Sequence, residues 1–106
     1  MISEDRVEKA LKYLRETDVL CAKAKALMKG LDDQKKTIHA IQYLKSTGAQ
    51  GEKDKIALAS SEYADHLDKV KTSIYDYEEL KNRRDTEVLI IETWRSMNAN
   101  QRRGNI

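Results

Sequence analysis

The chain has 106 residues, of which 36% are charged, and it contains four glycines, no proline and no phenylalanine. A net charge of +2 is too small for the strong overall field that attracts nucleic acids or membranes. The single cysteine, Cys21, excludes an internal disulfide framework and favours a reducing compartment. A highly charged chain without proline, and with helix-forming residues in a 3.5-residue repeat, predicts an all-α fold in one domain of residues 1–106.

The first predicted element is an N-terminal helix over residues 1–17. Ser3 is a suitable N-cap, and Glu4 and Asp5 follow in the first turn, where negative charge suits the helix dipole. Thr17 and Asp18 either cap a new helix or lie inside a continuous one, because the apolar spacing keeps its phase across them. Both arrangements fit the sequence.

The second predicted helix covers residues 18–47. Gly30 interrupts it at a cost of about 1 kcal/mol relative to alanine. We expect the helix to continue through Gly30, with at most a slight bend, because an apolar stripe stays in register across this position. The stripe is formed by residues three and four apart, which are Leu20, Ala24, Leu27, Leu31, Gln34, Ile38 and Ile41.

The centre of the chain predicts a loop with a short helical turn over residues 48–60. Ser60 and Ser61 then offer an N-cap for a long helix over residues 61–98, and residues 99–106 predict a basic tail. A second apolar stripe runs along the long helix and contains Tyr63, Leu67, Val70, Ile74 and Tyr77, with Val88, Ile91 and Arg95 continuing it.

These elements predict a long antiparallel helical hairpin, because a short central loop joins two long amphipathic helices. Residues 1–50 carry ten basic and seven acidic side chains, whereas residues 51–93 carry seven and eleven. Opposite balances favour antiparallel packing or self-association. The apolar stripes are too wide for two helices to cover, so either the N-terminal helix folds back or two hairpins pair. We favour a dimer that forms a helical bundle, because the N-terminal helix is too short to cover the long one.

No catalytic motif occurs in the chain, and we expect no enzymatic activity and no cofactor. If residue 47 faces residue 61 across the hairpin, His39 and His66 lie within about a turn of each other. Glu62 lies four residues before His66, so a Glu62/His66/His39 metal site is geometrically possible. We favour ordinary hydrogen bonds and expect no metal, because no further ligand recurs. Cys21 lies beside the stripe and is expected in the core.

Basic side chains provide the candidate binding residues. They form a group on the long helix and a second group at the C-terminal end. Tyrosines elsewhere in the chain could stack on bases, and Trp94 lies next to Arg95 in the sequence. The alternative is a solvated surface, because positive charge at a helix C-terminus also suits the dipole. The candidates for contacts with nucleic acid or a protein partner are Lys81, Arg83, Arg84, Arg95, Arg102 and Arg103.

Residues 22–31, 36–38 and 94–106 resemble small helical proteins encoded by tailed bacteriophages and prophages. The resemblance implies a phage protein in the cytoplasm of a bacterial host, compatible with one made early alongside replication or recombination proteins. The N-terminus has no signal-peptide pattern, and the apolar run 88–91 is too short to cross a membrane, so no membrane contact is expected.

Two functions follow from these observations. The first is a non-enzymatic accessory protein that binds DNA or a DNA-processing protein through the basic residues, with salt-dependent affinity. The alternative is a structural or assembly factor that acts through coiled-coil contacts between proteins and is largely indifferent to salt.

Overall fold

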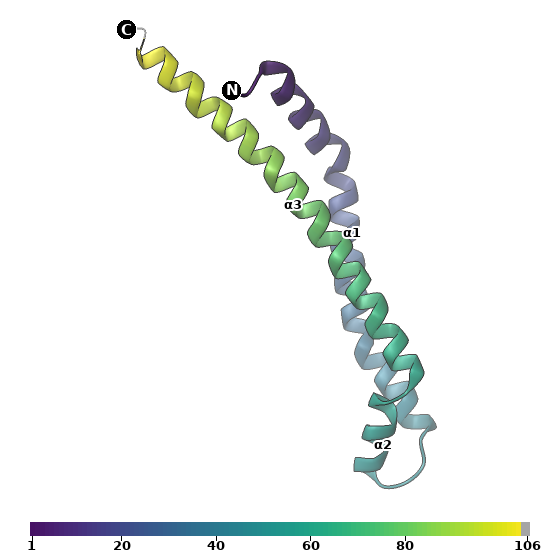
Figure 1. The fold of residues 1–106 in the computed structure, drawn as a ribbon. Coiled ribbons are helices and arrows are strands. Elements are labelled where there is room, and N and C mark those ends of the chain that lie inside the picture. Colours follow the sequence, from purple (N-terminus) through teal and green to yellow (C-terminus); the bar gives the residue numbers. More distant parts are fainter. Residues whose placement is uncertain (105–106) are drawn as a thin grey trace. The chain divides into compact units, whose positions relative to one another are not determined.

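The computed structural model describes residues 1–104, and over this range it contains three helices and no strand (Figure 1). Helix α1 is Glu4–Lys45, α2 is Gln50–Leu58 and α3 is Ser61–Gly104. The predicted all-helical fold and the helical hairpin are therefore confirmed. The helices form two compact units. Unit 1 holds Met1–Ala22 together with the chain from Glu78 onward, and unit 2 holds Lys23–Tyr77.

The helix boundaries differ from the sequence-based ranges at three places. Residues 1–17 and 18–47 do not form two helices, because α1 is continuous through Thr17, Asp18 and Gly30. The helical turn predicted within the loop over 48–60 is a longer helix of nine residues, α2. Helix α3 continues to Gly104, so residues 99–104 of the predicted tail are helical, while residues 105–106 lie outside the described range.

Two serine caps are found where the sequence predicts them. The Ser3 hydroxyl accepts a hydrogen bond from the backbone N–H of Arg6 at 3.1 Å. The Ser60 hydroxyl accepts one from the backbone N–H of Tyr63 at 3.2 Å. Each bond satisfies an N–H that has no partner within the first turn of a helix.

The least exposed residues of both long helices are spaced alternately by three and four, as in a coiled coil. None of these seam residues is exposed, but several of them are polar. On α1 the seam is Val7, Ala10, Leu14, Thr17, Cys21, Ala24, Met28, Leu31, Lys35, Ile38 and Gln42. On α3 it is Tyr63, His66, Val70, Ser73, Tyr77, Leu80, Arg84, Glu87, Ile91, Trp94 and Asn98.

The seam uses only part of the stripe predicted on α1. Ala24, Leu31 and Ile38 lie on it, whereas Leu20 and Leu27 are 57% and 59% exposed. Cys21, predicted in the core, is half-buried on the seam.

Within unit 2, the hairpin pairs α1 and α3 in a register different from the predicted one. In the predicted register residue 47 lies opposite residue 61 and His66 opposite residue 42, but His66 Nε2 lies 2.6 Å from the backbone carbonyl oxygen of Leu31. The last turns of α1 contact helix α2. The Lys53 ammonium lies 5.2 Å from the centre of the Tyr43 ring, and Ala57 is buried. The end of α1 therefore packs against α2, and α3 pairs with residues further back along α1 than a short loop would require.

Two glycines give a matched test of the backbone. We expect Gly30→Ala to stabilise the protein by about 1 kcal/mol, because a Cβ at this exposed helical position would contact nothing within 4 Å. Gly48→Ala should instead destabilise it by about 1–2 kcal/mol, because Gly48 has φ of 113° and its Cβ would lie 2.6 Å from Glu52 Oε2. Urea unfolding midpoints measure both changes. Equal shifts in the same direction would contradict the helical conformation of Gly30 or the positive φ of Gly48.

Candidate functional site

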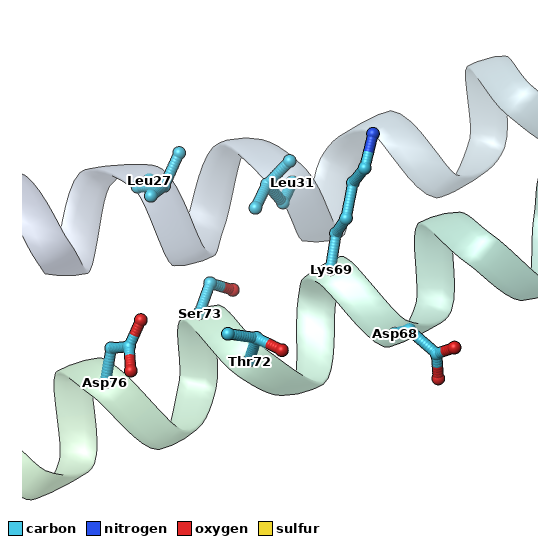
Figure 2. Close-up of a pocket in the computed structure, with 7 residues that line it drawn as sticks. All are labelled: Leu27, Leu31, Asp68, Lys69, Thr72, Ser73 and Asp76. Atoms are coloured by element: carbon cyan, nitrogen blue, oxygen red, sulfur yellow. The ribbon is translucent and has the colours of Figure 1, made fainter.

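An open groove lies between α1 and α3 in unit 2 (Figure 2). Leu27 and Leu31 supply its apolar surface from α1, and the Lys69 side chain extends from α3 toward α1. The remaining lining residues also come from α3 and are Asp68, Thr72, Ser73 and Asp76. A half-exposed leucine beside acidic and hydroxyl side chains suits contact with another helix better than enclosure of a small molecule.

The acidic side chains of the groove have no ionic partner within the part of the chain that the structure describes. Over residues 1–104, neither Asp68 nor Asp76 forms an ion pair, and the same holds for Lys23, which lies one helical turn before Leu27. All three side chains are exposed. Their charges are therefore available to a partner.

The two histidines occupy different sites. His66 is buried and contacts the Leu31 carbonyl, whereas His39 Nε2 lies 3.4 Å from Asp54 Oδ1 and packs near Tyr43 and Tyr63. The geometry on which a Glu62/His66/His39 metal site depends is therefore not found. Among residues 1–104, no group of three or more His, Cys, Asp or Glu side chains is arranged to hold a metal ion.

Arg84, one of the predicted binding residues, forms its hydrogen bonds and ion pair with residues of α1 inside unit 1. Its Nη1 donates hydrogen bonds of 2.7 Å to the Leu14 carbonyl and to the Thr17 hydroxyl, and its Nη2 lies 3.4 Å from Asp18. The side chain is 20% exposed. Arg84 therefore joins α3 to α1 and is not free to contact a phosphate.

Lys81 and Arg83 are more exposed and pair along their own helix. Lys81 lies 3.7 Å from Asp85, and Arg83 donates a 2.7 Å hydrogen bond to Glu79. Such exposed pairs four residues apart on a helix contribute only about 0.3–0.5 kcal/mol. The two cations can exchange these partners for a phosphate, but the acidic neighbours reduce the local positive charge.

The remaining candidates lie near the C-terminal end of α3. Arg95 and Arg102 line a small hollow together with Trp94, Asn98 and Ala99. Arg103 is exposed in the last turn. The structure thus brings two of the six predicted arginine and lysine side chains next to an aromatic ring.

A bidentate ion pair joins Arg6 on α1 to Glu87 on α3 in unit 1. Arg6 Nη1 lies 2.7 Å from Glu87 Oε2, and Arg6 Nη2 donates a 2.8 Å hydrogen bond to Oε1. This hydrogen bond lowers the pKa of Glu87 below its ordinary value of 4.5, against a smaller opposing effect of burial. It also raises the pKa of Arg6.

The lowered pKa predicts a loss of stability in acid. A carboxyl group whose pKa is lower in the folded state stabilises the fold above its unfolded pKa, and the effect disappears as the pH falls through the folded value. As the pH is lowered below 4.5, we expect the urea concentration at the unfolding midpoint to decrease less steeply for Glu87→Gln than for the wild type. Glu92→Gln, an exposed control on the same helix, should keep the wild-type pH dependence. Identical pH profiles for Glu87→Gln and the wild type would contradict this role.

No protein-family model matches the chain, and neither a curated protein nor a solved structure matches it. None of the helices described over residues 1–104 has an apolar stretch of the length needed to span a bilayer.

Four polar seam residues that join the helices lie off the stripe predicted on the long helix. They are His66, Ser73, Arg84 and Glu87, and the predicted stripe passes the first two because it includes the apolar neighbours Leu67 and Ile74. The alternating spacing of three and four that starts at Tyr63 passes through all four of them, and that regular spacing was the available signal.

Proposed function

We propose that this protein is a non-enzymatic structural or assembly factor that acts by packing its helices against helices of another protein chain. The single observation that supports this most is how little the chain buries on its own. Over residues 1–104 the buried hydrophobic residues are only Val7, Ala10, Ala57 and Val70, and no large side chain is fully buried.

The exposed surface supports the same proposal. Large hydrophobic side chains are prominent on this surface. In unit 2, those at least 40% exposed are Leu27, Ile41, Leu44, Ile56, Leu58, Ile74 and Tyr75. Apolar helix faces of this kind are covered in bundles and coiled coils, so we infer a homo-oligomer, with a dimer favoured.

Light scattering coupled to size exclusion, at low and high salt and with or without a short single-stranded DNA, tests this function. An assembly factor that associates through apolar helix faces should give a species larger than the monomer at both salt concentrations, unaffected by the DNA. A fully helical monomer at all concentrations and salt conditions would overturn the proposal.

A second candidate is the binding of DNA or of a DNA-processing protein, which the hollow beside Trp94 supports. Arg95 and Arg102 lie next to an aromatic ring, a combination that serves phosphate contact and base stacking. It predicts a gain of mass with DNA at low salt, lost at high salt and lost on reversing both arginines to glutamate. The resemblance to phage proteins supports a setting in the bacterial cytoplasm for either function.

A further inference from the structure

We propose that the partner at the unit 2 groove is a second copy of this chain, with α1 of each copy lying against α3 of the other. Lys23 of each copy then faces the acidic rim, Asp68 and Asp76, of its partner copy. The inference rests on the proposed assembly function and specifies the surface and the partner.

The charge distribution of unit 2 supports a self-complementary contact. The α1 part, residues 23–45, carries six basic and two acidic side chains. The α3 part, residues 61–77, carries four acidic and two basic side chains. Lys69 is the cation among the groove-lining residues, so the rim keeps a net negative charge. Two copies that place α1 against α3 bring opposite charges together, whereas contact between two α1 helices would oppose like charges.

The ion pairs inside unit 2 leave these particular charges unused. Asp32 pairs with Lys35 at 2.8 Å, and Asp54 pairs with His39 at 3.4 Å. Lys23, Asp68 and Asp76 are exposed and have no ionic partner within residues 1–104. In the proposed contact, Lys23 of the partner copy lies opposite this acidic rim, and the partner's acidic rim lies opposite Lys23.

The same surface supplies both the protruding side chain and the groove that receives it. Leu27 is 59% exposed and lies one helical turn from Lys23 and from Leu31, so an apolar contact and a cation share one face of α1. A two-fold axis through the groove brings this face of each copy onto the groove of the other, because a two-fold interface uses the same patch on both subunits.

Complementary charge reversals test the contact. We expect Lys23→Asp alone, and Asp68→Lys/Asp76→Lys alone, each to raise the dimer dissociation constant about tenfold or more, because each brings like charges together twice in a symmetric dimer. Mixing the two variants should restore association as a heterodimer, and the triple variant should recover a homodimer. Analytical ultracentrifugation measures the constants, and circular dichroism confirms that each variant stays helical.

A matched control reverses a charge on the far side of α1. Lys25 is exposed and lies two residues from both Lys23 and Leu27, which places it about 200° around the helix from each of them. Lys25→Asp should change the dissociation constant less than twofold. A dimer unaffected by the groove reversals would overturn this surface and leave the assembly function in place. A helical monomer in the wild type would overturn both.

Discussion

Replacing Arg84 with alanine is expected to destabilise the protein by about 2–3 kcal/mol, because the substitution removes hydrogen bonds from a charged donor that joins α3 to α1. The guanidinium donates to the Leu14 carbonyl and the Thr17 hydroxyl, both at 2.7 Å. Because Thr17 is buried, water cannot easily replace the hydrogen bond that its hydroxyl accepts from Arg84. Urea unfolding at a fixed protein concentration measures the change.

Arg83 provides the matched control for this prediction. It is the neighbouring residue and has the same chemistry, and within residues 1–104 its one ionic partner is Glu79, on its own helix at the exposed surface. Arg83→Ala should therefore change the free energy of unfolding by no more than about 0.5 kcal/mol. Equal losses in the two variants would contradict the structural role of Arg84.

Replacing His66 with alanine is expected to destabilise the protein by about 2–3 kcal/mol as well. The substitution removes a buried ring from the seam and its 2.6 Å contact with the Leu31 carbonyl, so it combines a cavity with the loss of a hydrogen bond. The measurement is again the urea midpoint at a fixed protein concentration. Loss of His66 should also weaken self-association, because Leu31 belongs to the proposed groove.

His39 is the natural comparison for His66. Its side chain is 32% exposed and contacts Asp54 of α2 at 3.4 Å. His39→Ala should cost about 1 kcal/mol or less, since water replaces an exposed partner at little cost. If His39→Ala proved the more destabilising of the two, the placement of His66 in the seam would be wrong.

The sequence was sufficient to predict the helices and their caps, because proline-free amphipathic segments and cap residues such as Ser3 and Ser60 act locally. Gly30 and Thr17 interrupt these signals only weakly. A penalty of about 1 kcal/mol for one glycine is small beside the packing on both sides, and α1 runs through it.

The longitudinal register could not be predicted, because a repeat of 3.5 residues fixes which face is buried but not how far one helix is shifted along the other. The pairing of His66 with Leu31 accompanies a connection in which α2 contacts the end of α1, through Lys53 to Tyr43 and through Asp54 to His39. The acceptors of Arg84 depend on the same shift. The spacing places Arg84 on the buried face, but the register decides that the Leu14 carbonyl and the Thr17 hydroxyl lie opposite it.

The polar seam also has a consequence for how the chain reaches its native state. Moving α3 along α1 by one heptad would preserve the spacing of the apolar residues but would place Arg84 opposite Val7 or Cys21 in place of Leu14. A guanidinium in this position would lose the Thr17 hydroxyl as an acceptor, because Ala10 or Ala24 would take its place, and burial with fewer hydrogen bonds is costly. Misaligned hairpins would therefore be short-lived during folding. Their helices would separate and pair again in the native register before a misaligned hairpin could associate with another chain.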